Sequence, residues 1–214
     1  MQGGRFGGMA GVGLVALMLA GCAGNRALVT REPLSDDKVG FGFFSHTTGD
    51  GAQRNHKHFD NFDLVRNAQV TGVQFWGLSD GTDSPDLENF DSFTVEIYDA
   101  GDDRSPGDAI YSFSVDIDDA TPQATGRRGI GTDGAGTGAE YAFTVMFDEP
   151  VSLTKETEYF LVVTASRIDP DSDNFMWSDG QRDDGISYSW SYDREQMLRI
   201  DDTDSALVIL GRPK

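Results

Sequence analysis

Three alternating aspartates are the feature of this sequence best suited to a specific chemistry. Asp169, Asp171 and Asp173 alternate in the stretch DPDSDN, which puts several carboxylates on one side of a tight loop. Hard oxygen ligands of this kind are what Ca²⁺ requires. The match to an EF-hand loop fails, because Asn174 stands where glycine is required and Gly180 where a bidentate glutamate is. A solvated acidic turn is the simpler interpretation, and calcium is the one cofactor that the sequence suggests.

The three tryptophans offer flat aromatic faces on which sugar rings could stack. Trp177 directly follows the acidic loop and is predicted to be an exposed ligand contact. Trp190 lies on the same side of an expected strand as Ile186 and Tyr188, which favours its burial. Trp76 follows Phe75 on the opposite side of another strand, and the sequence leaves open which of the two faces the core.

Other groups of residues indicate a metal site or an active site less clearly. His56 and His58, with Asp60, would put two imidazoles on one side of a strand, an arrangement able to hold a divalent metal. An exposed polar segment is the favoured interpretation. The chain has no Gly-x-Ser-x-Gly elbow for a nucleophile, and its many acids single out no carboxylate pair for glycoside hydrolysis. The sequence therefore predicts that the protein is not an enzyme and needs no cofactor.

The N-terminus predicts export and a lipid anchor. Met9–Leu19 is uncharged and mostly apolar, long enough for a signal peptide but shorter than the ~20 residues of a membrane-spanning helix. The tetrad Leu19-Ala20-Gly21-Cys22 resembles the lipobox of bacterial lipoproteins. That resemblance implies cleavage before Cys22 and acyl chains, such as palmitate, on this residue, so membrane lipid would be a partner. Cleavage by an ordinary signal peptidase after Ala23 is the alternative.

The residue after Cys22 bears on location. Lipoproteins that this chain resembles are retained in the inner membrane mainly by Asp at that position, and here it is Ala23. The outer membrane is therefore favoured if the cell has two membranes.

Charge and cysteine content exclude several partners. The chain has 17 basic and 36 acidic residues, and loss of Arg5 with the signal gives the mature chain a net charge of −20. Such a charge argues against nucleic acid and anionic lipid surfaces as partners. Cys22 is the only cysteine, so no intrachain disulfide can form.

Hydrophobic alternation defines the elements that must position any site. Apolar and polar residues alternate with period two in many short segments separated by Asp, Gly and Pro turns, and helical periodicity is almost absent. The expected strands are 41–45, 69–76, 93–98, 111–117, 141–147, 159–163, 186–192 and 206–210. This pattern predicts an all-β fold, an antiparallel β-sandwich of the jelly-roll type with long acidic and Gly-rich loops.

The predicted layout is a signal peptide (1–21), a lipidated flexible tether (22–38) and one β-sandwich domain (39–214). Within the domain, Gly126–Gly138 is expected to be a flexible loop, because it is long and rich in glycine. Arg194–Ile200 is expected to form a helical turn.

Several short motifs resemble a β-sandwich domain of secreted and surface-anchored bacterial proteins, many of which carry PEP-CTERM sorting tails. The motifs are Phe62-Asp63-Leu64, TGVQFWG (71–77), FTVEIY (93–98), Pro106-Gly107, Ser112-Phe113, YFLVV (159–163), FMWS (175–178) and Asp204-Ser205-Ala206-Leu207. The chain departs from that group because it stops at Arg212-Pro213-Lys214 without a hydrophobic tail. The resemblance implies fold and location but no established activity.

Three functions are consistent with these observations. The leading hypothesis is a non-catalytic, lipid-anchored β-sandwich of the cell envelope with a binding, adhesion or structural role, whose partner is a polysaccharide or a surface protein. The first alternative is a calcium-stabilised carbohydrate-binding module. The second is a hydrolase of unknown substrate, which no motif supports.

Overall fold

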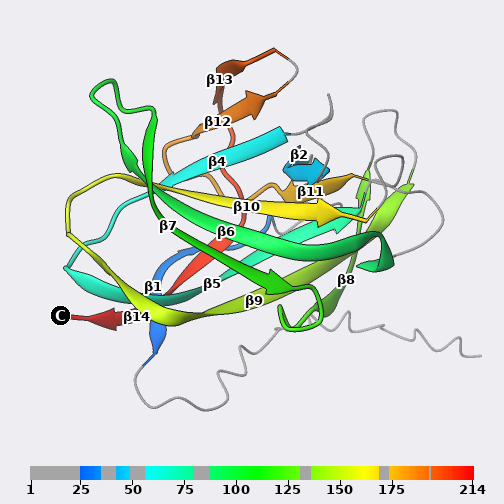
Figure 1. Ribbon diagram of the computed structural model, residues 1–214, viewed down its shortest axis with the longest axis horizontal. Helices are drawn as coiled ribbons and strands as arrows, with labels where there is room; N and C mark the ends of the chain where they lie inside the picture. The colour runs from blue at the N-terminus through cyan, green and yellow to red at the C-terminus, as the bar shows by residue number, and fades with distance from the viewer. Residues whose placement is uncertain are drawn as a thin grey trace, which may run out of the picture.

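Two seven-stranded β-sheets packed face to face make up the protein (Figure 1). The computed structural model describes residues 25–34, 42–48, 56–79, 87–130, 136–168, 174–192 and 194–214. An apolar face on each sheet requires a partner layer, and the two sheets cover each other. The predicted all-β sandwich is thus confirmed.

The first sheet, here called the β5 sheet, is built around its longest internal pairing, between β5 and β9. Its main path runs β1 (Arg26–Arg31), β14 (Leu207–Pro213), β5 (Ala68–Ser79), β11 (Phe175–Ser178) and β2 (Gly42–Phe44). Off this path, β9 (Gly136–Leu153) pairs with β5, and β8 (Gln123–Ile130) pairs with β9.

The second sheet, here called the β10 sheet, carries the candidate site. Its order is β13 (Gln196–Asp201), β12 (Ile186–Ser191), β4 (His56–Phe62), β3 (His46–Thr48), β10 (Tyr159–Arg167), β6 (Phe90–Ala100) and β7 (Pro106–Asp116). Neighbouring strands are antiparallel, except that β3 runs parallel to β10. A 3-10 turn, η1 (Leu87–Asn89), precedes β6, and the described residues contain no helix long and apolar enough to cross a membrane.

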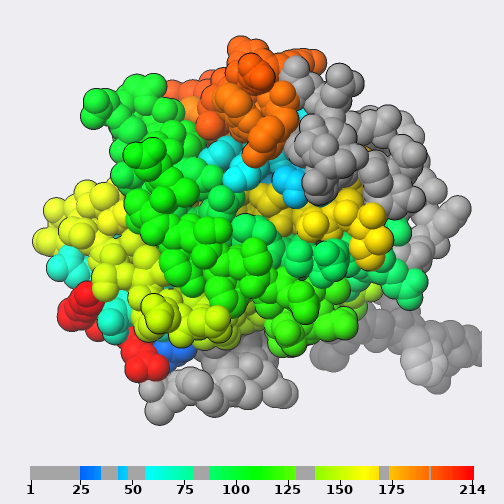
Figure 2. All heavy atoms as spheres, viewed as in Figure 1, coloured from blue at the N-terminus to red at the C-terminus, as the bar shows by residue number. Residues whose placement is uncertain are grey.

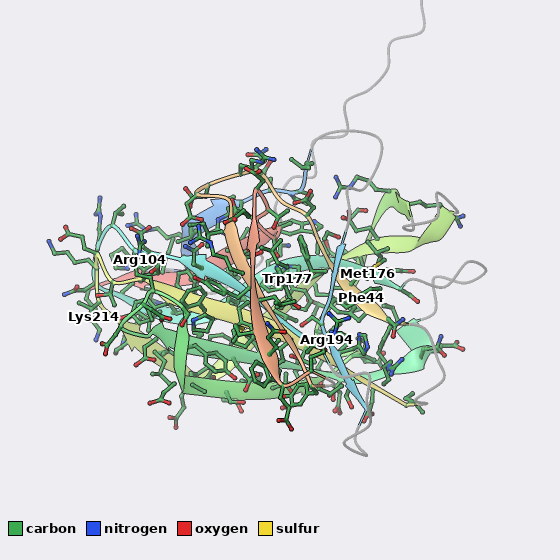
Figure 3. The ribbon with its side chains drawn as sticks, turned by 90° about the horizontal axis from the view of Figure 1, so that it is seen from above. Phe44, Arg104, Met176, Trp177, Arg194 and Lys214 are labelled. Carbon is green, nitrogen blue, oxygen red and sulfur yellow. The ribbon has the colours of Figure 1, made fainter. Side chains whose placement is uncertain are left out.

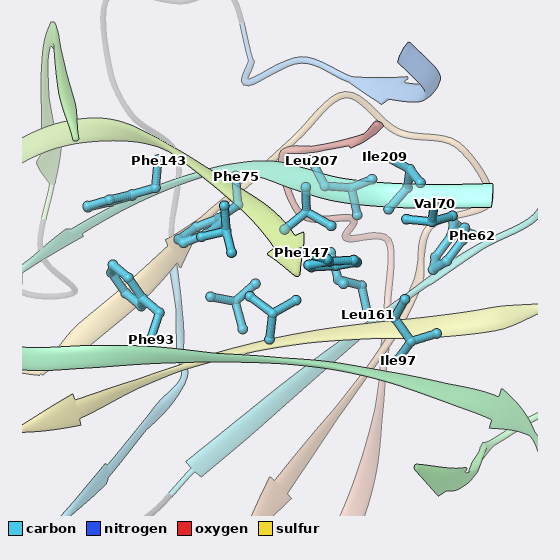
Figure 4. Packing of buried hydrophobic residues seen from close by; sticks show 14 of the residues in the cluster. Phe62, Val70, Phe75, Phe93, Ile97, Phe143, Phe147, Leu161, Leu207 and Ile209 are labelled. Carbon is cyan, nitrogen blue, oxygen red and sulfur yellow. The ribbon is translucent and has the colours of Figure 1, made fainter. Parts of the chain in front are cut away.

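The core lies between the sheets and is rich in phenylalanine (Figure 4). Phe75, Phe93 and Phe143 contact one another with ring centroids 4.8 to 5.1 Å apart. A register shift in β5 against β9 between Val70 and Gly72 lets Val70 and Val73 both face the core. Strict alternation would have put these two residues on opposite faces, and a bulge is the usual way to shift it.

The tether predicted for residues 22–38 is wrong over part of its length. Arg26–Arg31 form β1, which pairs antiparallel with β14, and Gln181 N–H donates to Glu32 O beyond it. Leu28 and Val29 pack against the core from this strand. An unpaired β14 edge would expose its backbone groups, and β1 satisfies them.

Two other local predictions are wrong where the structure describes them, which for the first excludes residues 131–135. The expected flexible loop at Gly126–Gly138 includes the end of β8 and the start of β9, which pair with each other. Arg127 fixes this pairing by donating from Nε to Glu140 Oε2 over 2.7 Å. The expected helical turn at Arg194–Ile200 is largely β13, because β12 offers this segment a row of backbone partners.

Candidate functional site

Strand β4 divides its side chains between the interior and the outside of the β10 sheet. Asp60 pairs with Arg31 of β1, in the opposite sheet, so Asp60 points inward. Because successive side chains of a strand point to opposite faces, Lys57, Phe59 and Asn61 point outward. The outer face of this sheet is therefore built from a segment that also contacts the core.

A second hydrophobic cluster covers this outer face. Phe59, Phe160, Val162 and Tyr188 are all buried there and form a group separate from the main core; we call these four residues the outer cluster. Partly buried side chains pack around it, namely Tyr98, Ala100, Ile186, Trp190 and Met197. In Figure 2, atoms of β4 (cyan) lie between the β6–β7 hairpin (green) and the β12–β13 hairpin (orange).

A charged pair sits beside the outer cluster. Lys57 Nζ lies 2.5 Å from Glu96 Oε2 and donates to the Tyr98 hydroxyl over 3.2 Å. Burial acts to lower the pKa of Lys57, but the hydrogen bond and charge of Glu96 outweigh it and raise the pKa. For the Tyr98 phenol, in contrast, burial raises the pKa. Lys57 therefore stays an ammonium, and the pair presents fixed donors and acceptors next to aromatic rings.

Two aromatic rings border this pair on the outside. Trp190 is partly exposed, and Tyr192 is 43% exposed; their ring centroids are 6.3 Å apart and the planes almost perpendicular. Trp190 is paired in register with Lys57 across β12 and β4. Toward β7 the face becomes polar, since Thr94 and Ser114 share a hydrogen bond of 3.0 Å. The face thus combines aromatic surface with hydrogen-bonding groups.

An acidic groove of about 310 Å³ lies at the end of β4, where Asn61, Phe62 and Asp63 line it. Five carboxylates line it, those of Asp63, Glu156, Glu158, Asp183 and Asp184. Two guanidinium groups, of Arg31 and Arg104, also line it, so the lining has an excess of three negative charges. Tyr188 of the outer cluster donates to Arg104 O over 3.4 Å, which joins the groove to the rest of the face.

Asn61 lies in the groove between two of these carboxylates. Its Nδ2 donates to Glu158 Oε1 over 3.0 Å and to Asp184 Oδ2 over 2.7 Å. The side chain is only 6% exposed, and its Oδ1 is buried without a hydrogen-bond partner among the described residues. A buried acceptor without a donor carries a desolvation cost, which the two hydrogen bonds of Nδ2 oppose.

The floor of the groove rests on a buried ion pair. Arg31 Nη1 lies 2.5 Å from Asp60 Oδ1, and Asp60 also accepts from the backbone N–H of Ser205. Burial raises the pKa of the Asp60 carboxyl to about 7, against the opposing charge of Arg31. This pair joins β1 to β4 and so holds the two sheets together beneath the groove.

A tight turn presents the groove's Asp183 and Asp184. Asp204 Oδ2 accepts from the backbone N–H groups of Asp183, over 2.6 Å, and Gly185, over 3.0 Å. Gly185 has a φ of 69°, a left-handed conformation that glycine adopts without strain. The Asp184-Gly185 turn therefore positions two groove carboxylates.

The prediction that Trp177 is an exposed ligand contact is wrong. Trp177 is fully buried in the core (Figure 3), and its Nε1–H donates to Ala206 O over 2.9 Å. Its neighbour Met176 takes the outward side of β11, because β11 pairs with β5 inside the sheet and its residues alternate.

The exposed polar segment expected around His56 and His58 is wrong as well. His58 is completely buried, stacked on Phe43 at 4.1 Å, and edge-on to Trp177. Burial lowers the pKa of His58 to about 3, so the imidazole is neutral in the fold. His46 and His56 lie next to each other, with ring centroids 5.7 Å apart.

The remaining predicted site residues lie outside the described residues. They are Cys22, the lipidation site, and Asp169, Asp171 and Asp173, the candidate calcium ligands. Among the residues that are described, no cluster of three or more His, Cys, Asp or Glu side chains could hold a metal ion.

Sequence reasoning missed most of the outer face. In the sequence, Lys57 is only the residue between two histidines, and Glu96 is one of 36 acidic residues. The alternation of Lys57, Phe59 and Asn61 was the available signal, since it puts a charge, an aromatic ring and an amide on one side of a strand. The pairing of Lys57 with Glu96 joins residues 39 positions apart and needs the fold to be seen.

Comparison with known proteins gives little beyond the fold. No protein-family model and no curated protein matches the chain. Among solved structures it is similar to the cysteine protease and lectin-like domains of a surface layer associated protein of Clostridium difficile, with a TM-score of 0.44 and 10% identity. The match covers 74% of this chain and 32% of that one, so the chain spans about a third of that protein's length. A similarity of this degree does not carry function from one protein to the other.

Proposed function

We propose that this protein is a non-catalytic glycan-binding module, held at the cell envelope by lipid on Cys22. The observation that carries the proposal is the pairing of aromatic surface with fixed charged groups on one outer face. Trp190 and Tyr192 would stack on sugar rings, and the Lys57–Glu96 pair would bind hydroxyl groups beside them.

The physical chemistry of sugars supports this assignment. A sugar ring has an apolar face of C–H groups and a rim of hydroxyls, so a binding face needs aromatic rings and hydrogen-bonding groups close together. Lys57 supplies donors and Glu96 acceptors, and their mutual hydrogen bond holds both in place before a ligand arrives. The partial exposure of Trp190 leaves ring surface available for stacking.

A glycan array with the purified lipid-free domain, with and without Ca²⁺, tests the proposal. We expect binding to a subset of polysaccharides, and we expect Trp190→Ala to weaken it about tenfold or more, the typical loss when a stacked aromatic ring is removed. Trp76→Ala is the matched control, because Trp76 is also partly exposed but lies on the outer face of the other sheet.

Two outcomes would contradict the proposal. One is the absence of binding to any glycan in either condition. The other is an equal loss of binding in the Trp190 and Trp76 variants, which would separate binding from this face. Membrane fractionation of Cys22→Ser tests the anchor independently, and unchanged membrane association would contradict it.

An adhesive or structural role is the second candidate, favoured by a different observation. Toward β7 the outer face is covered by small hydroxyl side chains, among them Thr94, Ser112 and Ser114. Such a surface suits contact with another protein of the cell surface. Pull-down of a defined surface protein by a domain that binds no glycan would favour this role.

A further inference from the structure

Basic side chains gather at one end of the sandwich, where β1 begins and β14 ends (Figure 1, beside the letter C). Asn67, in the turn between β4 and β5, accepts at its backbone O from Lys214 N–H over 2.8 Å and at Oδ1 from Lys155 N–H over 2.9 Å. Arg212 Nε donates to Asn25 Oδ1 over 2.9 Å, directly before β1. Four segments that are far apart in the sequence therefore meet at this end.

The charge of these segments is opposite in sign to that of the whole protein. Residues 25–27, 63–67, 152–157 and 211–214 hold five basic and two acidic residues, whereas the whole chain has 17 basic and 36 acidic residues. The two acids are Asp63 and Glu156, which both line the acidic groove; Glu156 Oε1 lies 3.3 Å from Lys155 Nζ in an exposed and therefore weak pair. All five basic residues are exposed, and we call them the basic end: Arg26, Arg66, Lys155, Arg212 and Lys214.

An exposed apolar side chain lies within the basic end. Val65 is 81% exposed and directly precedes Arg66 in the turn between β4 and β5. Leu64, just before it, is buried, and its backbone O accepts from Glu156 N–H over 2.9 Å, which holds the turn in place. Cations around an exposed apolar tip suit a membrane surface, where the cations meet headgroup phosphates and the apolar group lies between headgroups.

The proposed lipid anchor is close to the basic end along the chain. β1 begins at Arg26, four residues after Cys22, and four residues of chain span at most about 14 Å. Because β1 is paired with β14, the domain has no longer tether on which to move away. The charges of a membrane act over about 8 Å at physiological ionic strength, so the basic end feels them while acids farther along the molecule are screened.

We infer that the basic end docks on the anionic headgroups of the membrane that holds Cys22. This inference rests on the proposed lipid anchor and adds the orientation of the domain. β4 ends at Phe62, next to the basic end, while Trp190 is paired with Lys57 near its start, roughly 17 Å away along the strand. The aromatic rings of the glycan-binding face would therefore lie away from the membrane, and the net negative charge of the rest of the domain favours the same orientation.

The test uses the mature lipidated protein with one added cysteine. Cys22 is the only cysteine of the chain and its thiol carries the lipid, so Val65→Cys can be labelled alone with the dye nitrobenzoxadiazole. The protein is reconstituted into phosphatidylcholine vesicles with or without phosphatidylglycerol, each containing a lipid with a nitroxide on its headgroup. We expect the nitroxide to quench the dye at least about twofold more on the anionic vesicles, and the difference to shrink as salt is raised.

Leu198→Cys is the matched control for the label. Leu198 is 39% exposed on β13, the edge strand beside β12, and is paired with Ser189. The same dye at this site is expected to show little quenching on either kind of vesicle, because the inferred orientation holds this hairpin away from the headgroups.

Two pairs of substitutions test whether the basic charges set the orientation. Arg66→Gln with Lys155→Gln removes two charges from the basic end, and is expected to lower the quenching of the dye to about the level on neutral vesicles. Arg194→Gln with Arg199→Gln removes two exposed charges from the β12–β13 hairpin, and is expected to leave the quenching unchanged. Figure 3 shows Arg194 well away from Lys214, so the two variants have the same net charge but differ in where it is lost.

The outcomes separate this inference from the proposed function. Protein that floats with the vesicles but shows equal quenching of the two labels, or none, overturns the docking and leaves the anchor standing. Equal quenching on neutral and anionic vesicles, or an equal loss in the two charge variants, also overturns it, because the basic end would then not be what the membrane attracts. Protein that does not float with the vesicles overturns the anchor and the docking together, while glycan binding is measured separately on the array.

Discussion

The outer faces of the two sheets each carry a partly exposed tryptophan, yet they differ in almost everything around it. On the β5 sheet, Trp76 is paired in register with Ala142, the nearby Gln74 donates to Thr144 over 3.4 Å, and Met146 farther along β9 is 45% exposed. On the β10 sheet, Trp190 lies in register with Lys57, which is paired with an acid. The β10 sheet also has the groove, whereas the charged pair on the outer side of the β5 sheet, Arg127 with Glu140, has a fully buried carboxylate.

An aromatic residue alone therefore does not mark a binding face. Trp76 and Trp190 look alike in the sequence, since each lies in an alternating run. Only Trp190 is in register with a partly exposed charged pair, whose two members come from β4 and β6. The contrast extends inward, because the inner side of β4 carries His58 and Asp60 while that of β5 is apolar.

The largest expected effect tests whether the outer cluster is a true second core. Phe160→Ala is expected to lower the free energy of unfolding by about 3–5 kcal/mol, because the ring is fully buried and would leave a cavity. Met146→Ala, on the other outer face, is expected to cost less than about 0.5 kcal/mol. Urea denaturation measures both. Equal costs would remove the distinction between the faces.

The next prediction concerns pH and the inner side of β4. The pKa of His58 falls from 6.5 to about 3 on folding, so its contribution to stability is present above pH 6.5 and is lost as pH falls toward 3. The pKa of Asp60 rises from 3.8 to about 7, so its contribution is present below pH 3.8 and is lost as pH rises toward 7. Between about pH 4 and 6.5 the two oppose each other, each with a slope of about 1.4 kcal/mol per pH unit.

Single substitutions are expected to expose the two slopes. His58→Phe removes the His58 contribution, so this variant is expected to lose stability relative to the wild type as pH rises from 4 to 7. Asp60→Asn removes the Asp60 contribution, so this variant is expected to lose stability relative to the wild type as pH falls over the same range. The comparison with the wild type cancels the other titrating groups, such as Asp179, whose pKa burial raises to about 6. Urea midpoints measured at several pH values check both, and differences from the wild type that change in the same direction would contradict the prediction.

The sequence predicted the strands better than it predicted the site. Period-two alternation located the long strands such as β6, β7 and β10, because one face of each packs in the core. It missed β1 and β13, short strands whose conformation depends on the partner strand and not on their own composition.

The site was missed for a different reason. Trp177 follows an acidic loop in sequence, and nothing local reveals that β5 and β2 enclose its strand on both sides. Lys57 and Glu96 become partners only after β4 and β6 are placed on either side of β10. The burial of Trp177 and the pairing of Lys57 with Glu96 both depend on which strands pair. The spacing of residues along the sequence does not reveal that pairing.

A smaller effect should separate the charged pair on the β10 sheet from a neutral hydrogen bond on the β5 sheet. Glu96→Gln is expected to cost about 1.5–3 kcal/mol, because it leaves Lys57 charged and partly buried without its carboxylate. Gln74→Ala on the β5 sheet breaks a neutral hydrogen bond and is expected to cost about 1 kcal/mol or less. A double-mutant cycle with Lys57→Met isolates the coupling of the pair, and a coupling near zero would show that the charges are not fixed by each other.

The smallest expected effect is on the groove's own ion pair. Arg104→Asn is expected to leave the urea midpoint unchanged, because the exposed guanidinium is screened by water and costs little to release. The Lys57–Glu96 pair on the same face would then stabilise the fold, while the Arg104–Glu158 pair would not. That contrast follows from exposure, since the side chain of Lys57 is 18% exposed and that of Arg104 is 75% exposed. A clear drop in the midpoint would show that the exposed pair stabilises the fold as the partly buried pair does.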